Sequence, residues 1–226
     1  FLKLLMIPKI IHQIWIQGFS SMPKEDRIAV ESIKNLNPDW QHIIWDDTSI
    51  KNLLQEYPDI LKVYKNVDTL PSSNRISKWA SMSDIARWVI VARYGGCYMD
   101  VDVKCIASLN IITSSLPTTG EFVATGKTTP LILKSKSVLS GQFFISTSNC
   151  TVWKDVFANI LKSKTKEDLG SSFTDAFLNE AVENSSALYI LPKELLTMYH
   201  CGCTSTYMKP IKLGATEFNP FSTSLD

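Results

Sequence analysis

The sequence lacks an excess of charge of either sign. Its 23 basic and 22 acidic residues give a formal net charge of +1. Proteins that bind nucleic acid or other polyanions usually carry a basic surface, so we expect no nucleic-acid partner. Any phosphate that this chain recognises must be bound by a small, local group of residues.

Long apolar runs are also lacking, and none approaches the roughly 18 residues that a membrane-spanning helix needs. Residues 1–5 are apolar but too short for a signal peptide. Met6, followed by Ile7-Pro8-Lys9, is typical of a natural start. We therefore interpret residues 1–5 as an artificial addition or as the remnant of a removed membrane anchor. The first interpretation predicts a cytoplasmic protein of viral or bacterial origin, and the second predicts a protein of the Golgi lumen.

A disulfide framework is missing, because the five cysteines are odd in number and irregularly spaced. His200-Cys201-Gly202-Cys203 has no second pair of ligands at the spacing of a zinc site, so reduced thiols in a loop are expected there. Repeats, low-complexity tracts and linkers are lacking as well. With 226 residues, of which 45% are hydrophobic, we expect one domain over residues 7–226, as a monomer or weak dimer.

Short apolar runs alternate with amphipathic segments along the chain. Residues 9–16 and 40–45 have the length and composition of buried strands, and further strands are expected at 97–103, 121–125, 142–146 and 187–191. Helices are expected from Pro23 to about Leu36, after residues 46–48, and at 74–94, 152–162 and 173–182. Ser72, Ser73 or Asn74 would cap the start of the long helix, and Gly95-Gly96 would end it.

This alternation predicts an α/β fold with a Rossmann-like, mainly parallel central sheet flanked by helices. Ligands of such sheets bind beyond the carboxyl ends of the strands. Candidate functional residues are therefore sought where the predicted strands end.

Asp100 and Asp102 lie two apart on the predicted strand 97–103, so both carboxylates can point the same way. Two carboxylates that face one direction repel each other unless a cation lies beside them. Oxygen ligands suit Mg²⁺ or Mn²⁺, which keep positions open for substrate phosphates. The pair is thus a candidate metal site, although an Asp-x-Asp pair on its own is more often a solvated strand end.

Asp84 and Arg87 lie three apart on the preceding predicted helix and share a face. A planar guanidinium can bind two diphosphate oxygens at once, and a carboxylate can accept hydrogen bonds from sugar hydroxyls. The alternative is an ordinary ion pair on a helix surface. Gly95-Gly96 would bring this helix close to the acidic strand, so that all four charged groups meet in one pocket.

Several motifs occur in an order that makes the chain recognisable. They are Ile10-Ile11-His12-Gln13-Ile14-Trp15-Ile16, Asn37-Pro38-Asp39-Trp40, Trp45-Asp46-Asp47, Ser83-Asp84-Ile85-Ala86-Arg87 and Tyr94-Gly95-Gly96-Cys97-Tyr98-Met99-Asp100-Val101-Asp102. Together they resemble the DXD-containing sugar transferases of glycosyltransferase family 32, which include yeast-type mannosyltransferases and capsular polysaccharide transferases. They are also similar to the catalytic core of the large clostridial glucosylating toxins. The resemblance covers roughly the first half of the chain.

The resemblance implies a GT-A fold, a nucleotide-sugar donor bound with Mn²⁺ or Mg²⁺, and transfer with retention at the anomeric carbon. Residues 7–105 would bind the donor, and 106–226 would form the acceptor side and a closing segment. A UDP-sugar is favoured over GDP-mannose, with a glycan or glycoprotein as acceptor. By this resemblance, the base would contact Ile14 and Trp15, with Gln13 nearby, and Tyr98 would lie beside the donor. The catalytic residues would be four: Asp84 and Arg87 at the sugar and diphosphate, and Asp100 and Asp102 at the metal.

The chain departs from the family pattern in its second half. Relatives carry an asparagine where Gln142 stands, and a closing His- and Trp-containing segment where this chain has residues 216–226. Glu217 or Ser222 could complete the metal site, or this tail could lie exposed. Two alternatives follow from the departure and from the family: a catalytically weak module that binds nucleotide sugars or glycans, and a toxin-like effector that glycosylates a host protein.

Overall fold

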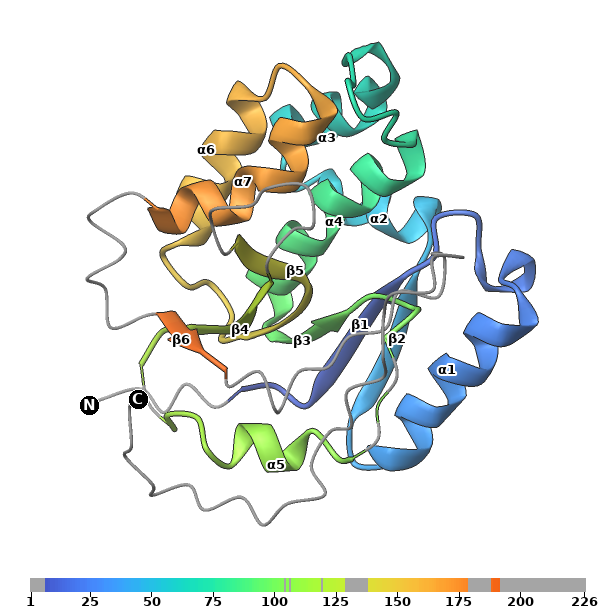
Figure 1. The fold of residues 1–226 in the computed structure, drawn as a ribbon, viewed down its shortest axis with the longest axis vertical. Helices are drawn as coiled ribbons and strands as arrows, with labels where there is room; N and C mark the ends of the chain where they lie inside the picture. Colours follow the sequence, from blue (N-terminus) through green and yellow to red (C-terminus); the bar gives the residue numbers. More distant parts are fainter. Residues whose placement is uncertain are drawn as a thin grey trace.

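The computed structural model describes residues 7–103, 105, 107–118, 120–128, 138–178 and 188–191. Strands in this part of the chain form one six-stranded sheet (Figure 1). They are β1 (Ile10–Ile14), β2 (Gln41–Trp45), β3 (Gly96–Met99), β4 (Val123–Thr128), β5 (Val138–Ser146) and β6 (Leu188–Ile190), in the spatial order β2-β1-β3-β5-β4-β6. Strand β1 pairs in parallel with β2 and β3, and β4 pairs in parallel with β6. Only β5 runs antiparallel to its neighbours among these strands.

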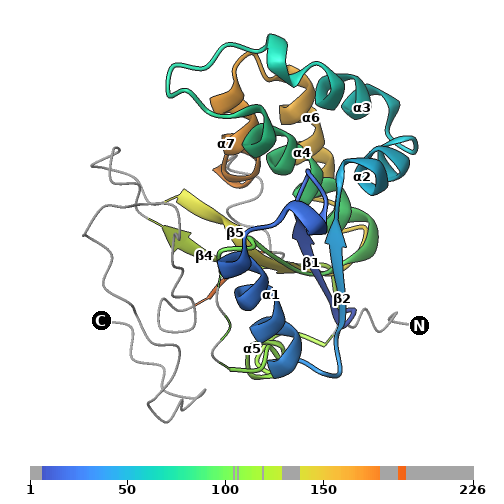
Figure 2. The same cartoon turned by 90° about the vertical axis from the view of Figure 1, so that its right-hand side faces the viewer.

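Helices cover both faces of this sheet. They are α1 (Lys24–Leu36), α2 (Asp47–Leu54), α3 (Pro58–Lys65), α4 (Lys78–Tyr94), α5 (Asn110–Thr113), α6 (Trp153–Lys162) and α7 (Lys166–Leu178), with short 3-10 turns η1 (Phe19–Ser21) and η2 (Val67–Thr69). Helices α1 and α5 lie on one face, and α2, α3, α4, α6 and α7 on the other (Figures 1 and 2). No helix within the described residues combines the length and hydrophobicity needed to cross a bilayer.

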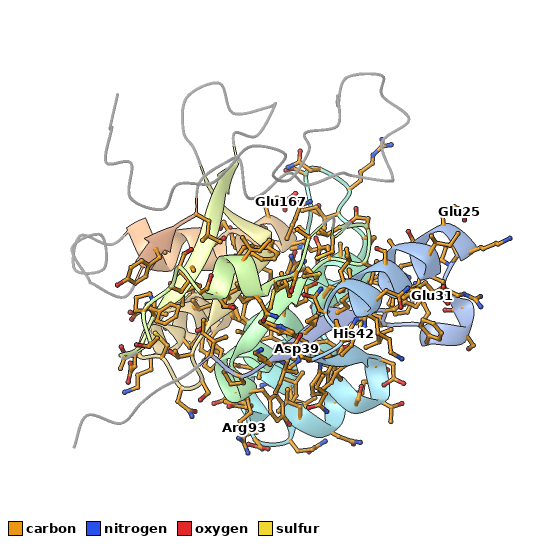
Figure 3. All side chains as sticks on the ribbon, turned by 90° about the horizontal axis from the view of Figure 1, so that it is seen from below. Glu25, Glu31, Asp39, His42, Arg93 and Glu167 are labelled. Atoms are coloured by element: carbon orange, nitrogen blue, oxygen red, sulfur yellow. The ribbon has the colours of Figure 1, made fainter. Side chains whose placement is uncertain are left out.

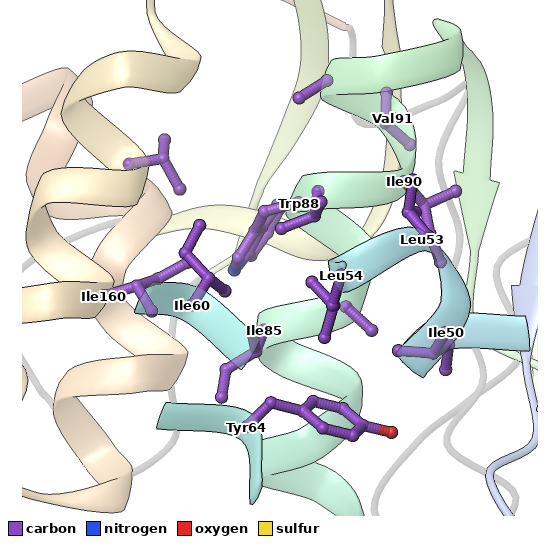
Figure 4. Close-up of a cluster of buried hydrophobic side chains, with 14 of the residues drawn as sticks. Ile50, Leu53, Leu54, Ile60, Tyr64, Ile85, Trp88, Ile90, Val91 and Ile160 are labelled. Atoms are coloured by element: carbon purple, nitrogen blue, oxygen red, sulfur yellow. The ribbon is translucent and has the colours of Figure 1, made fainter. Parts of the chain in front are cut away.

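Each face of the sheet has its own apolar core. On the α4 side, Tyr64, Ile85 and Trp88 are among the residues buried between α2, α3, α4 and α6 (Figure 4). On the α1 side, Ile11 and Ile33 belong to a second cluster with the buried side chains of β3 and β5. Helix α4 is buried along most of its length, because it lies between the sheet and the other helices of its layer. Its polar residues are therefore held inside the molecule.

Two glycines let α4 turn directly into β3. Gly95 and Gly96 have φ values of 66° and 91°, which favour glycine. A Cβ on Gly96 would lie 2.5 Å from the carbonyl oxygen of Ile10, so only glycine lets β3 lie this close to β1. The predicted helix stop at Gly95-Gly96 is thus confirmed.

The α/β fold with its mainly parallel sheet was correctly predicted, but several boundaries were wrong. Helix α4 begins at Lys78, with Ser77 as its cap, rather than at Asn74. Residues 72–76 instead form a loop whose Ser72 and Ser73 hydroxyls bind the Glu167 carboxylate. Helix α7 begins at Lys166, seven residues earlier than the predicted 173, and residues 179–182 of that prediction lie outside the described part.

Candidate functional site

The two acidic residues of the predicted metal site lie on a turn. Strand β3 ends at Met99, and the N–H of Val103 donates to the carbonyl oxygen of Asp100 at 3.1 Å. The prediction of a strand through residue 103 was therefore wrong, because the chain folds back at Asp100 instead of continuing its pairing. Asp100 and Asp102 nevertheless line the same pocket. This acidic turn follows the carboxyl end of a central strand, which is where ligands of such sheets bind.

The pocket has a volume of about 290 Å³ and is formed by β1, α4 and the acidic turn. It brings together six of the predicted site residues, namely Ile14, Trp15, Arg87, Tyr98, Asp100 and Asp102. The other lining residues are Ile16, Gln17, Trp79, Ala80, Ser83 and Val101. Aromatic rings and charged groups thus share one small cavity, as expected for a ligand with an apolar ring and an anionic portion.

Arg87 connects helix α4 to both other parts of the site. Its Nη2 donates to Asp84 Oδ1 at 2.6 Å, and its Nη1 donates to the carbonyl oxygen of Gly141 at 2.6 Å. Nη1 also lies 3.5 Å from Asp100 Oδ1. Burial alone would lower the pKa of Arg87, but Tyr98 and the three nearby aspartates raise it above its usual value. The guanidinium is therefore a fixed positive charge in the wall of the pocket.

Asp84 lies behind Arg87. The ion pair between them is largely buried, with side chains 17% and 10% exposed, so it is not an ordinary surface pair. Asp84 is absent from the described residues that line the pocket, and its Oδ2 faces α7, where an added Cβ on Gly170 would lie 3.4 Å away. Burial raises the pKa of Asp84, although Arg87 acts in the opposite direction. Its contact in this structure is to the guanidinium, which it orients toward Gly141 and Asp100.

Asp100 is held by Tyr98, whose hydroxyl donates to its Oδ1 at 2.7 Å. Tyr98 is buried under the pocket, and the Arg87 guanidinium carbon lies 5.2 Å from the centre of its ring. Burial raises the pKa of Asp100, and the charges of Asp102 and Asp84 add to this. Arg87 and the Tyr98 hydroxyl lower the pKa but do not fully offset the increase. The negative charge of Asp100 is thus only partly compensated by its protein neighbours.

Trp15 and Ile14 form the opposite wall of the pocket. Trp15 directly follows β1 and is partly exposed, with its Nε1 donating to the Ser21 hydroxyl at 2.9 Å. Ile14 is buried and belongs to the core on the α4 side. Trp15 lines the pocket and belongs to neither apolar core of the described residues, which argues against the alternative of an ordinary core residue. An indole fixed by its N–H in this way offers a flat surface for an aromatic ligand.

The residues of the acidic turn fit a divalent cation. Asp100 and Asp102 supply carboxylate oxygens, which Mg²⁺ and Mn²⁺ prefer. In the described part of the chain, no third His, Cys, Asp or Glu joins them in a cluster that could hold an ion. Two carboxylates suit an ion that takes its other ligands from water and substrate phosphates. The only partly compensated charge of Asp100 is a second reason for expecting a cation there.

Some residues near the site were missed from the sequence. Ser83, Ala80 and Trp79 lie about one and two turns before Arg87 on α4, so helical spacing from Arg87 would have identified them. Asp26, in the first turn of α1, was also missed: burial and the charge of Asp102 raise its pKa. No signal in the sequence links Asp26 to Asp102, because the two are brought together by the packing of α1.

Two further predicted residues contact the turn without lining the pocket. The carbonyl oxygen of Gln142 accepts from the N–H of Asp100 at 2.9 Å, so its main chain holds the turn. Gln13 is buried beneath the turn and does not reach the predicted base-binding wall. Glu217 and Ser222, predicted as possible metal ligands, lie outside the described residues, as does the His200–Cys203 segment.

Comparison with known proteins finds similarity over part of this chain. Residues 23–118 match the family model of the glycosyltransferase sugar-binding region containing the DXD motif. An uncharacterized glycosyltransferase of Acanthamoeba polyphaga mimivirus is 36% identical over 106 residues, which make up 46% of this chain and 39% of the relative. Inositol phosphoceramide mannosyltransferase 3 of Schizosaccharomyces pombe is 33% identical over 105 residues, covering 46% of this chain and 26% of the relative. The chain spans less than half the length of these curated relatives.

A solved structure has a similar fold at low sequence identity. The PaToxG glycosyltransferase covers 79% of this chain and 73% of its own, with a TM-score of 0.57 and 18% identity. The predicted GT-A fold is thereby confirmed.

Proposed function

We propose that this chain, whose residues 23–118 belong to the DXD-containing sugar-binding regions of glycosyltransferases, is a metal-dependent glycosyltransferase. It would transfer a hexose from a nucleotide-sugar donor to a glycan or protein acceptor, with retention at the anomeric carbon. The observation that carries the proposal is the placement of Arg87. Its charged guanidinium faces a pocket that also contains the Asp100–Asp102 turn and the partly exposed Trp15.

Different residues of the pocket would bind different parts of a nucleotide-sugar donor. Trp15 would stack on the base, and Arg87 would bind the diphosphate through the part of its fork that faces the pocket. Asp100 and Asp102 would hold Mn²⁺ or Mg²⁺, whose chemistry is to neutralise the charge of the diphosphate as it leaves. Asp84 does not line the pocket and would act by keeping the Arg87 guanidinium in place.

The site does not need a protein nucleophile. Glycosidases use two carboxyl groups on opposite sides of the sugar, about 5–9 Å apart. Asp100 and Asp102 lie on one turn, at one side of the pocket. In the proposed transfer, the acceptor hydroxyl attacks the anomeric carbon from the side of the leaving diphosphate, one of whose oxygens takes the proton. Arg87 stabilises the charge that develops on that diphosphate.

Thermal unfolding with added ligands tests the proposal. A ligand that binds only the folded protein raises its melting temperature. We expect a rise of a few degrees with Mn²⁺ plus one donor from a panel of UDP-glucose, UDP-galactose, UDP-N-acetylglucosamine and GDP-mannose. We favour the UDP-sugars, while the name of the fission-yeast relative gives GDP-mannose a place in the panel.

Two variants complete this experiment. Asp102→Asn should lose the metal-dependent rise, whereas Asp39→Asn should keep it, because Asp39 is exposed and paired with Lys9 away from the pocket. Slow release of free sugar from the donor, dependent on Mn²⁺, would distinguish an enzyme from a module that only binds. A rise that persists in Asp102→Asn would contradict the assigned metal site, and binding without any turnover would favour the binding module.

A further inference from the structure

The main chain of Asp100 is held from two directions. Its N–H donates to the carbonyl oxygen of Gln142 on β5 at 2.9 Å. Its own carbonyl oxygen accepts from Nε2 of Gln13, on β1, at 3.2 Å. The register between β1 and β3 ends at His12 and Tyr98, so Asp100 lies past the last paired residues. Through its side chain, Gln13 thus adds a bond between β1 and the first residue of the acidic turn, beyond the end of the strand pairing.

The Gln13 amide has one orientation. A carbonyl oxygen can only accept, so the Gln13 atom beside the Asp100 carbonyl must be the donor Nε2. Oε1 of Gln13 then faces His42, whose Nε2 lies 2.8 Å away and must donate. Gln13 is 0% exposed, so no solvent competes for either bond. Burial and the charge of Lys34 lower the pKa of His42 to about 4, which leaves a neutral ring that carries its proton on Nε2 at neutral pH.

These contacts reach Asp100 from the face opposite its carboxylate. His42 lies on the α1 side of the sheet (Figure 3), where it also lines a pocket of about 560 Å³ between α1 and β2. Tyr98 and Arg87, which contact the Asp100 carboxylate, belong to the α4 side. The two hydrogen bonds that link His42, Gln13 and the Asp100 carbonyl oxygen therefore fix the backbone of Asp100 and leave its carboxylate available for a metal ion.

We propose that Gln13 and His42 are positioning residues that hold the acidic turn in the geometry a divalent cation requires. This inference rests on the proposed function. Metal ligands must be held to within about 0.5 Å, and the groups that fix them often affect metal affinity about 10- to 100-fold. Without Gln13, the Asp100 carbonyl oxygen keeps its bond from the Val103 N–H, within the same turn, but loses its bond from β1. We expect Asp100 and Asp102 then to move apart more easily. The alternative is that the two side chains only join β1 to β2.

Metal affinity separates these two roles. Mn²⁺ is titrated into the protein with UDP or GDP present, and free Mn²⁺ is followed by electron paramagnetic resonance. Gln13→Met keeps the volume but removes the donor, and we expect about ten-fold weaker Mn²⁺ binding. His42→Leu should weaken binding in the same direction, and His42→Gln, which retains a donor for Gln13 Oε1, should restore it. In turnover, the Mn²⁺ concentration for half-maximal rate should rise while kcat at saturating Mn²⁺ changes little.

His12→Gln is the matched control. Like His42, His12 is a histidine on a strand, and it is buried and precedes Gln13 in the sequence. Its ring, however, bonds to the Gly95 carbonyl oxygen and to Trp45, on the α4 side of the sheet. We expect it to lower the melting temperature while leaving Mn²⁺ affinity unchanged. Should Gln13→Met fail to fold, the His42→Leu and His42→Gln pair carries the test.

The outcomes distinguish the inference from the function on which it rests. Mn²⁺ binding by Gln13→Met or His42→Leu equal to that of the wild type would overturn the positioning role and leave the metal site intact. A wild type that binds no Mn²⁺ with either nucleotide would overturn both.

Discussion

Nη1 of Arg87 lies 3.5 Å from Oδ1 of Asp100, across the junction between helix α4 and the turn that follows β3. Lysine cannot replace this arrangement, because its single nitrogen cannot occupy the two positions from which Nη1 contacts Gly141 and Asp100 and Nη2 contacts Asp84. We expect Arg87→Lys to lower kcat/KM by about 100-fold or more. Arg93→Lys on the same helix is the control, since Arg93 is exposed and pairs with Glu56, away from the pocket. Equal rates in the two variants would contradict the role of Arg87.

Trp15 offers a test of the base-binding wall. Base–aromatic stacking contributes roughly 1–3 kcal/mol, so Trp15→Ala should raise KM for the donor about ten-fold or more while kcat changes little. Trp15→Phe should retain most of the affinity, because a flat ring remains in the pocket. Steady-state kinetics with varied donor measures both parameters. A fall in kcat at unchanged KM would instead place Trp15 at the reacting atoms.

Alanine substitutions at Gly96 and Gly18 distinguish two causes of lost stability, backbone strain and steric collision. Both have positive φ, of 91° and 86°. An alanine at Gly18 would meet nothing within 4 Å, so Gly18→Ala should cost only strain, about 1–3 kcal/mol. An alanine at Gly96 would collide with the Ile10 carbonyl oxygen, and β3 would have to move away from β1. Urea unfolding should therefore show a distinctly larger loss for Gly96→Ala; similar losses would mean that β3 relaxes freely.

His12 makes stability depend on pH. Its Nδ1 accepts from Trp45 Nε1, and its Nε2 donates to the Gly95 carbonyl oxygen, so a proton on Nδ1 would face another N–H. Burial, with a smaller effect of His42, lowers the pKa of His12 from 6.5 to about 4 despite the bond to Gly95. The unfolded chain then binds the proton more readily, and stability falls as pH drops from about 6.5 toward 4.

The loss due to His12 should be of the order of 3 kcal/mol once pH reaches about 4. Urea unfolding at pH 7.5, 6 and 5 measures it, and His12→Gln should flatten the slope. His42, whose pKa is also lowered to about 4, adds a loss in the same direction. A stability that is constant over this range would contradict the buried, neutral state of both rings.

Elements with strong local signals were predicted correctly from the sequence. The isoleucine-rich β1, the end of α4 at Gly95 and the shared helix face of Asp84 and Arg87 depend on neighbours in the chain. Boundaries that depend on distant residues were missed. Residues 72–76 read as the start of α4, yet Glu167 binds Ser72, Ser73 and the Asn74 N–H and holds them as a loop. The turn at Asp100 depends likewise on Gln13 and Gln142, which no local pattern connects to it.

The charged residues that line the pocket come from one stretch of chain, residues 87–102, whose contacts are close in sequence. Such contacts close at a small entropic cost. Their supports at Gly141 and Gln142 come from β5, some forty residues further along. During folding, α4 and β3 can therefore meet early, while Arg87 and the Asp100 turn gain their final partners only when β5 docks. Binding of a nucleotide to this pocket, measured without acceptor, would therefore show when β5 has docked.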